Sequence, residues 1–323
     1  MSDQRSPEMS VVIVTPDCYE TIRKTIGHIR AQNIRDRLEV VIVAPSTDGL
    51  GLDEAELRDF LWVRVVEVGA IRSIAWANAA GVRQARAPVV VLAEDHCYPE
   101  PGWAEALINA HRQSWAAVGP VVRNANPDSS ISWADLLLGY APWLDPAPAG
   151  VIDHLPGHNS DYKQAILLDY GPDLEAMLEA ESLLHWDLRA KGYQLYLEPA
   201  AKVFHLNFGR LSSWIPAQFH SGRVFGAARG RSWSPLRRLL YAGGAPFIPV
   251  VRVWRILRRA RRAGSRHLPL NVLPALILGL VVSAFGELLG YASGAGDAKQ
   301  KLSTFEFHRV RHLANQARHA RSR

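Results

Sequence analysis

The sequence predicts an α/β protein, in which a doubly wound domain with a parallel sheet precedes a C-terminal membrane-associated helical region. Short β-branched runs alternate with amphipathic stretches over the N-terminal two thirds of the chain, which favours the α/β domain. After residue 207 the chain becomes strongly basic and then strongly apolar, which favours the membrane-associated region. With 323 residues, 48% of them hydrophobic, the chain can bury a large core.

The N-terminal elements follow the order strand, helix, strand. The runs SVVIVTP and LEVVIVAPS are β-branched and bounded by proline, and Ile22, Ile26 and Ile29 recur between them at helical spacing. Further strands are predicted at 61–68, 87–95, 116–122, 193–199 and 201–207, and helices at 73–85, 103–114 and 174–193. The Pro-, Asp- and Trp-rich segment 124–156 is predicted to be an irregular insertion or a long active-site loop.

These patterns divide the chain into five parts. They are a disordered N-terminus at 1–9, the α/β domain at 10–207, a linker with basic amphipathic helices at 208–267, a membrane-inserted or re-entrant apolar helix at 268–294, and a basic tail at 295–323.

Charge is distributed unevenly along the chain. Residues 1–199 carry 16 Lys/Arg and 28 Asp/Glu, a balance of −12, whereas residues 200–323 carry 21 and 3, a balance of +18. The basic part indicates a polyanionic partner, either nucleic acid or anionic phospholipid. In the segment 249–264, arginines recur at spacings of three and four while apolar residues line another face, which is typical of a helix in a membrane interface. Nucleic acid is disfavoured, because the arginines alternate with apolar residues rather than with exposed stacking aromatics.

The apolar segment 268–294 is close to the roughly 20 residues that span a bilayer. Pro274, Gly279 and Glu287 interrupt it, and basic residues flank it on both sides, so the positive-inside rule does not choose an orientation. A re-entrant or in-plane helix is as plausible as a single span, and the core helix of a soluble protein is the alternative. The polar N-terminus and the two cysteines indicate neither a signal sequence nor a disulfide framework, so we expect a cytoplasmic location.

Two acids and an imidazole follow the buried run Val89–Leu92. Glu94, Asp95 and His96 fall at the carboxyl end of a predicted parallel strand, which is where ligands bind in open α/β sheets. Taken alone, they fit a solvated acidic turn as well as a ligand site.

The order of motifs resembles that of family 2 glycosyltransferases, which are inverting nucleotide-sugar enzymes with the Rossmann-like GT-A fold. The resemblance covers residues 10–207 and rests on five stretches, which are SVVIVTPDCYETIRKTIGHIRAQ, LEVVIVAPSTDG, ANAAGVRQARAPVVVLAEDHCYPEPGW, GHNSDYKQAIL and EAESLLHWDLRAKGYQLYLEPAAKVFHLN. The C-terminal GELLGYASG is similar to the tail of bacterial membrane-associated members. The resemblance implies a hexosyltransferase for cell-envelope polysaccharide or glycolipid, anchored at the cytoplasmic face of the plasma membrane.

In that family, the acidic strand end binds a divalent cation and the sugar diphosphate. The resemblance places these roles on Glu94 and Asp95, with His96 where an aspartate is more usual. It also implies His205 as a further metal ligand or a phosphate contact, with a packed or surface histidine as the alternative. Carboxylate oxygens suit Mg²⁺ or Mn²⁺, and imidazole is well tolerated by Mn²⁺.

An inverting transfer needs a base beside the attacking hydroxyl. Glu181 aligns with the second acid of the family's ED motif, and Glu179 lies two residues before it. Because two positions on a helix that are two residues apart face different directions, only one of these carboxylates can point into the cleft, and we expect it to be Glu181. The alternative is an exposed acid that complements the dipole at the start of a helix.

The resemblance also implies contacts with the donor and the acceptor. Donor-binding candidates are Pro16, Asp17, Asp48, Arg72, Asn78, Glu94 and Asp95. Ala44 and Pro45 stand where the family usually has two acids that contact the base, so the donor can be UDP- or GDP-linked. Candidates for the loop and the acceptor platform are Asn159, Lys163, Trp133 and Trp143, although the tryptophans can equally fill the core, and Arg223 is a phosphate candidate or a structural residue.

The expected function is metal-assisted, inverting transfer of a sugar to a lipid-linked or saccharide acceptor near the membrane. Two alternatives stay open. One is a nucleotidyltransferase of the same fold, which is disfavoured because TPDCYET lacks a glycine-rich phosphate loop. The other is a catalytically inactive membrane adaptor, which the loss of acids at Ala44 and Pro45 favours.

Overall fold

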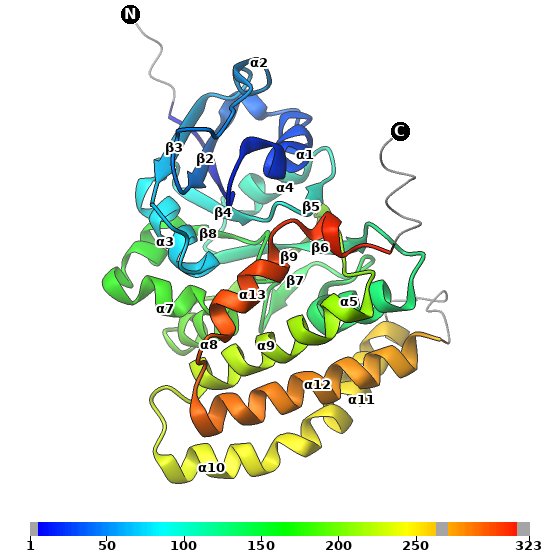
Figure 1. The fold of residues 1–323 in the computed structure, drawn as a ribbon. Helices are drawn as coiled ribbons and strands as arrows, with labels where there is room; N and C mark the ends of the chain where they lie inside the picture. Colours follow the sequence, from blue (N-terminus) through cyan, green and yellow to red (C-terminus); the bar gives the residue numbers. More distant parts are fainter. Residues whose placement is uncertain (1–5, 263–270, 315–323) are drawn as a thin grey trace, which may run out of the picture. The chain divides into compact units, whose positions relative to one another are not determined.

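The computed structural model describes residues 6–262 and 271–314, and the chain divides into two compact units (Figure 1). The first unit comprises Met1–Arg123 and Ala147–Phe204, and the second comprises Asn124–Pro146 and His205–Arg323. Most of the segment predicted to be an insertion, 124–146, therefore belongs with the C-terminal helices. The predictions for residues 1–5, 263–270 and 315–323 lie outside the described residues.

The sheet has the strand order β3-β2-β1-β4-β8-β6-β9-β5, and β7 pairs with β9 outside this path. The strands are β1 (Met9–Val14), β2 (Leu38–Ala44), β3 (Trp62–Glu67), β4 (Val89–Ala93), β5 (Cys97–Pro99), β6 (Ala117–Asn124), β7 (Gly150–Ile152), β8 (Asp161–Lys163) and β9 (Leu195–His205).

β1 lies between β2 and β4, and all three strands are parallel. Every residue of these strands is buried, which is the pattern of strands covered on both faces. The strand order reverses at β1, so the carboxyl ends of β1 and β4 flank the position where ligands bind in such sheets. Met9, which the sequence predicts to be disordered, is the first residue of β1 and pairs with Leu38 and Val89.

The helices of the first unit cover this sheet. They are α1 (Tyr19–Arg30), η1 (Arg35–Arg37), α2 (Glu54–Leu57), α3 (Ile74–Gln84), α4 (Trp103–Ala110), α6 (Gln164–Leu168), η3 (Gly171–Asp173), α7 (Leu174–Leu178) and α8 (Glu181–Ala190). α3 packs closely on β1 and β2, because a Cβ at Gly81 would lie 2.4 Å from Val12 Cγ1 and 2.9 Å from Val43 Cγ2.

The single helix predicted at 174–193 is interrupted. It consists of α7 and α8, and between them Ala180 is extended, with φ −145° and ψ 95°. The predicted end is confirmed, since Gly192 has φ +87°. The break makes Glu181 the first residue of α8 instead of a residue inside a long helix.

The two strands predicted at 193–199 and 201–207 form one continuous strand, β9. β5, β7 and β8 have three residues each and do not appear in the prediction, because such short runs give no periodic signal. β8 is antiparallel to both β4 and β6, and it occupies a central position in the sheet.

The second unit is helical. Its helices are α5 (Ser130–Tyr140), η2 (Ala141–Trp143), α9 (Leu211–Arg229), α10 (Pro235–Gly244), η4 (Ala245–Phe247), α11 (Ile248–Arg262), α12 (Val272–Ser293), α13 (Ala298–Glu306) and η5 (Arg309–His312). α5 falls in the segment predicted to be irregular. The side chain of Ser129 caps α5 by accepting hydrogen bonds from the backbone N–H groups of Ile131 and Ser132. Leu136 and Leu137 of α5 are buried.

Among the described residues, α12 is long and apolar enough to cross a membrane, with a mean hydropathy of 2.2. Of that segment, 44% is buried inside the protein.

α9 and α12 pack backbone to backbone through glycines. A Cβ at Gly222 would lie 2.0 Å from the carbonyl oxygen of Ser283, and a Cβ at Gly226 would lie 2.4 Å from that of Glu287. From the α12 side, a Cβ at Gly286 would lie 2.1 Å from the carbonyl oxygen of Phe219 on α9. Small residues at four-residue spacing permit this approach, as in helix pairs within membranes.

Substituting Gly286 by alanine should therefore destabilise the second unit. The added methyl group would meet backbone, which cannot rotate away, and we expect a loss of about 1–3 kcal/mol in the free energy of unfolding. Gly139→Ala is the matched control, since Gly139 lies inside α5 with no atom within 4 Å of its Cβ position. That change should raise the free energy of unfolding by about 0.5–1 kcal/mol, because glycine is less favourable than alanine inside a helix. Chemical denaturation of both variants measures the difference, and equal effects would contradict the packing.

Candidate active site

Asn159 fixes the carboxylate that ends β4. Its amide nitrogen donates to Glu94 Oε2 at 2.8 Å, and its backbone N–H donates to the carbonyl of Leu92 at 2.7 Å. Its own φ is +65°, a left-handed conformation that asparagine adopts more readily than most residues. Asn159 is 4% exposed. The sequence-predicted Asn159 and Glu94 are therefore brought together, and the segment before β8 is joined to the end of β4.

His158 lies between two acids of the site. Its Nε2 is 3.0 Å from Glu181 Oε1, and its Nδ1 is 4.0 Å from Glu94 Oε1. Gly157 leaves the room that Glu181 needs, because a Cβ there would lie 2.5 Å from Glu181 Cδ. The stretch GHNSDYK contains this histidine, but the sequence prediction chose Asn159 and Lys163 from it. The signal that could have found His158 is an imidazole next to a residue already assigned to the site.

Two buried side chains near Glu181, those of His185 and Tyr162, are uncharged. His185 follows Glu181 by one turn of α8, and its Nε2 is 2.9 Å from Tyr162 Oη on β8. Burial lowers the pKa of His185 to about 3, so its imidazole is uncharged at neutral pH. Burial also raises the pKa of the Tyr162 phenol well above its usual value. Both groups add bulk beneath Glu181 without adding charge.

Each imidazole of the predicted metal site has its Nδ1 engaged by an oxygen. His96 Nδ1 is 2.5 Å from Asp95 Oδ1, and His205 Nδ1 is 2.8 Å from Asn207 Oδ1. Such an oxygen fixes the tautomer and presents Nε2 as the metal-binding atom. Asp95, which is also predicted to be a ligand, lies against His96 through this contact.

Glu94, His96 and His205 form a candidate metal site. β4 leads to the first two, and β9 carries His205 as its last residue. One ligand atom from each residue lies within 4.8 Å of the others. One carboxylate oxygen and two imidazole nitrogens suit Mn²⁺ and other first-row divalent ions better than Mg²⁺, which prefers oxygen ligands alone. The residues present therefore fit a divalent cation, with Asp95 and Asn207 as the groups that orient the imidazoles.

The donor candidates after β1 and β2 lie in short loops. Pro16 and Asp17 follow β1, where the Asp17 carboxylate accepts hydrogen bonds from Cys18 N and Thr21 Oγ1, both at 2.7 Å, and so begins α1. Asp48 is exposed in the loop after β2. Glu67, the last residue of β3, pairs in register with Ala44 and accepts hydrogen bonds from Ser46 Oγ and Thr47 N in the loop after β2. These hydrogen bonds lower the pKa of Glu67.

The remaining donor and loop candidates are dispersed. Arg72 is exposed and its guanidinium lies 5.2 Å from the ring centre of Trp76. Asn78 is 2% exposed within α3, and its Oδ1 has no hydrogen-bond partner. Lys163 pairs in register with Val89, at the opposite end of β4 from Glu94, and its Nζ donates to the carbonyl of Gln113. The structure thus does not bring Lys163 to the site.

Both tryptophans proposed as an acceptor platform have structural contacts within the second unit. Trp143 is 8% exposed in η2, so it fills the core, which was the stated alternative. Trp133 Nε1 donates to the carbonyl of Pro127 at 2.8 Å. Arg223, the phosphate candidate, donates from Nε to the carbonyl of Gly294 at 3.0 Å and thereby caps the end of α12.

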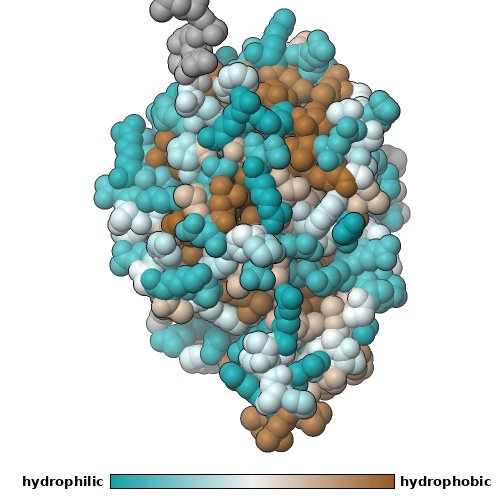
Figure 2. Space-filling view, turned by 90° about the vertical axis from the view of Figure 1, so that its left-hand side faces the viewer, coloured by the Kyte–Doolittle hydropathy of each residue, from teal (hydrophilic) through white to brown (hydrophobic). Residues whose placement is uncertain are grey.

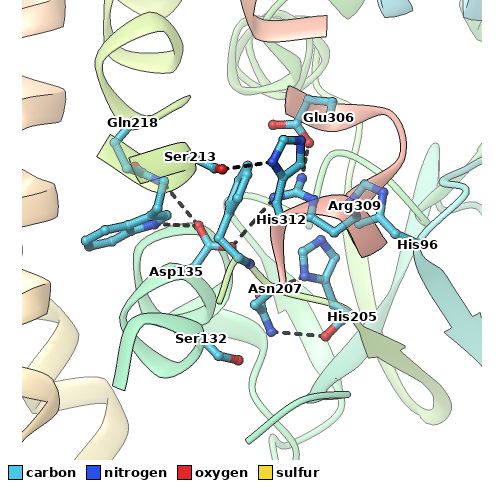
Figure 3. Close-up of polar contacts among 12 residues, drawn as sticks. His96, Ser132, Asp135, His205, Asn207, Ser213, Gln218, Glu306, Arg309 and His312 are labelled. Carbon is cyan, nitrogen blue, oxygen red and sulfur yellow. Dashed lines mark hydrogen bonds and ion pairs between the residues drawn. The ribbon is translucent and has the colours of Figure 1, made fainter. Parts of the chain in front are cut away.

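A buried polar network surrounds Asp135 in the same unit. Its carboxylate accepts hydrogen bonds from Trp214 Nε1 at 2.9 Å and from Gln218 Nε2 at 3.1 Å, as Figure 3 shows for Gln218. Arg309 Nη1 lies 3.9 Å from the same carboxylate. Burial nevertheless raises the pKa of Asp135. Figure 3 also shows Asn207 beside His205, which it orients.

The metal assignment predicts a graded effect on Mn²⁺ binding. Glu94→Gln and His205→Gln remove ligand atoms, and each should lower the affinity for Mn²⁺ more than about 100-fold. Asp95→Asn changes only the group that orients His96, so it should lower the affinity about 10-fold. Electron paramagnetic resonance titration of free Mn²⁺ measures the affinities. His28→Gln, which removes a half-buried imidazole stacked on Tyr98, is the control. A full loss in Asp95→Asn with no loss in His205→Gln would contradict the assignment.

Comparison with known proteins agrees with the resemblance inferred from the motifs. Residues 10–170 match the family described as Glycosyl transferase family 2. No curated protein matches the chain.

Three solved structures that are similar to this chain have 14–17% sequence identity to it. GalNAc-T7 with UDP, GalNAc and Mn²⁺ has a TM-score of 0.49, and the match covers 63% of this chain and 44% of GalNAc-T7. The mannosyltransferase PcManGT from Pyrobaculum calidifontis with GDP-Man and Mn²⁺ has a TM-score of 0.49, and the match covers 94% of this chain and 88% of PcManGT. S. aureus TarS 1–349 has a TM-score of 0.45, and the match covers 91% of this chain and 88% of TarS. This chain thus spans less than half of GalNAc-T7. It belongs to glycosyl transferase family 2 and is a glycosyltransferase of that family with the GT-A fold.

Proposed function

We propose that the protein transfers a sugar, with inversion, from a UDP- or GDP-linked donor to a lipid-linked or membrane-proximal saccharide acceptor. The observation that carries this proposal is the chain of contacts from Glu94 through His158 to Glu181. It connects the candidate metal ligand, where the diphosphate would bind, with a carboxylate that could accept a proton. The side chain of Glu181 is 20% exposed, so an acceptor hydroxyl can reach it.

In this proposal Glu181 is the general base. Its carboxylate takes the proton of the acceptor hydroxyl while that oxygen forms a bond to the anomeric carbon. On the opposite face of the sugar, the bond from the anomeric carbon to the diphosphate oxygen breaks, and the nucleoside diphosphate leaves with the electron pair. His158 orients the Glu181 carboxylate through the 3.0 Å contact. Ala180, extended before α8, and Gly157, which has no side chain, give this carboxylate its position.

Glu94, His96 and His205 would hold the divalent cation, and Asp95 and Asn207 would orient the two imidazoles. A cation bound there supplies positive charge that stabilises the diphosphate leaving group. Asp17, Asp48, Arg72 and Asn78 stay donor-binding candidates for the base, the ribose or the phosphates.

The proposed location is the cytoplasmic face of the bacterial plasma membrane. The basic C-terminal region and the apolar α12 support attachment to an anionic lipid surface rather than to nucleic acid. A membrane-bound enzyme of this kind would act on acceptors of the cell envelope, either polysaccharides or glycolipids.

The role of Glu181 predicts a loss of turnover without a loss of folding. Glu181→Gln keeps the shape of the side chain but removes its basicity, so kcat should fall about 10²–10⁴-fold. Release of nucleoside diphosphate from a panel of nucleotide sugars with Mn²⁺ measures it, in detergent-solubilised full-length protein. Glu179→Gln is the matched control, because Glu179 is the C-cap residue of α7, two residues before Glu181, and should be dispensable.

Three results distinguish the alternatives. Full activity in Glu181→Gln would exclude this residue as the base. Equal losses in Glu179→Gln and Glu181→Gln would indicate a general effect of charge. No turnover by the parent protein with any donor would favour the inactive adaptor over the enzyme.

A further inference from the structure

α12 has two different faces along its length. One face is packed against protein and carries the small residues Gly279, Ser283, Gly286 and Gly290. The other is exposed and apolar, with Leu273, Ile277, Leu278, Val281 and Phe285 between 38% and 56% exposed. Leu273, Ile277, Val281 and Phe285 repeat every four residues and form one stripe along the helix, and Leu278 lies next to Ile277 in the sequence. A helix that crossed a bilayer alone would instead meet lipid on all sides.

α9 accompanies α12 along most of its length. The ring of Trp214 lies against Gly279, the backbone of Gly222 lies against Ser283, and that of Gly226 lies against Glu287. Because the residue numbers rise together, the two helices run parallel. Their contacts are made by backbone atoms, so the pair cannot separate without losing its packing. If α12 crossed the membrane, α9 would have to cross with it.

α9 is a poor membrane span. It carries Gln218, His220, Arg223 and Arg229, and the last two are held in protein contacts. Arg223 Nε donates to the carbonyl of Gly294, and Arg229 Nη1 donates to Tyr291 Oη at 3.2 Å. Charged side chains near the centre of a bilayer are costly and need partners. These observations favour a position of the α9–α12 pair at the membrane surface over a position across it.

The helices that contact α12 also expose apolar side chains. α10, η4 and α11 contact α12, and α10 and α11 lie beside it in Figure 1. Their most exposed apolar side chains are Leu236 (80%), Leu239 (64%), Leu240 (72%), Phe247 (71%), Val250 (71%) and Trp254 (60%). Figure 2 shows hydrophobic residues gathered at the lower end of the molecule, where the α10 region lies in Figure 1. So large an exposed apolar area marks an interaction surface.

The charge around this face matches an anionic partner. Residues 199–286 contain 14 Lys/Arg and no Asp or Glu. Exposed arginines adjoin the apolar side chains: Arg237 lies 4.3 Å from the ring centre of Trp233, and Arg258 lies 5.2 Å from that of Trp254. Arginine beside tryptophan is the arrangement of side chains at the boundary between lipid head groups and acyl chains.

We propose that the exposed stripe of α12 and the exposed apolar side chains of α10, η4 and α11 form one surface that lies in the plane of an anionic membrane. We call it the membrane face. The protein would then be monotopic, with the apolar side chains among the outer parts of the acyl chains and the arginines at the lipid phosphates. Both ends of α12 would lie on the same side of the bilayer. This inference rests on the membrane attachment proposed above.

Vesicle binding by the full-length protein tests the lipid assignment. Flotation with vesicles of phosphatidylglycerol and phosphatidylcholine should recover the protein, whereas phosphatidylcholine alone should recover at least about tenfold less. The double variant Leu236→Ser, Leu240→Ser should bind at least about tenfold more weakly to the anionic vesicles. Val151→Ser, at a 58% exposed valine on β7, is the matched control and should bind like the parent.

Two outcomes would overturn the lipid assignment. Equal binding of the double variant and the control would exclude the membrane face as the contact. A protein that does not float but forms dimers, which the double variant abolishes, would assign the face to a second copy of the chain. Donor hydrolysis in detergent is measured in parallel, so a failure of membrane binding is distinguishable from a failure of catalysis.

The depth of α12 distinguishes an in-plane helix from a span. Single cysteines at Leu273 and Val281, in a Cys18→Ser background, carry a fluorophore that lipids spin-labelled at known depths quench; buried Cys97 is left in place. The two positions are separated by about 12 Å along the helix axis. For an in-plane helix both labels should be quenched at the same shallow depth. A label at Val281 about 10 Å deeper than the label at Leu273 would establish a span and refute the proposal.

Discussion

The hydrogen bond between Asn159 and Glu94 is the constraint on which the rest of the active site depends. It joins the end of β4 to the segment that leads into β8, and the left-handed backbone of Asn159 turns that segment at this point. The turn sets His158 between Glu94 and Glu181, and Gly157 leaves room for the Glu181 side chain. A buried amide that also bonds to the strand backbone keeps these groups in one geometry before any substrate binds.

His96 stands where an aspartate is more usual, and its contacts give a physical reason for a histidine there. Asp95 Oδ1 contacts Nδ1 of His96, and Asn207 Oδ1 contacts Nδ1 of His205. In the proposed site, two oriented imidazoles and one carboxylate would form the donor set, and Asp95 would orient one of the imidazoles. A softer, nitrogen-containing set of this kind should prefer Mn²⁺ to Mg²⁺.

Much of the fold could be predicted from periodicity, because the parallel strands are continuous apolar runs and α1 has its isoleucines at helical spacing. The acids at the end of β4 and Glu181 were also accessible from the motif order. Tertiary contacts decided the rest. The extended Ala180 divides a stretch that is helical by composition, Trp143 is buried despite its Pro-rich surroundings, and Arg223 donates to the carbonyl of Gly294 at the end of α12. His158 and Glu67 carry no periodic signal, so only spatial proximity identifies them.

In the proposed mechanism, Glu94, His96 and His205 together bind the cation that supports sugar transfer. Anomalous diffraction at the manganese edge, from crystals grown with Mn²⁺ and a nucleoside diphosphate, can locate this cation. We expect one strong peak bonded to a Glu94 oxygen and to Nε2 of both histidines, with the diphosphate on its open side. A peak bonded to Asp95 with either histidine outside bonding distance, or no peak at the end of β4, would contradict it.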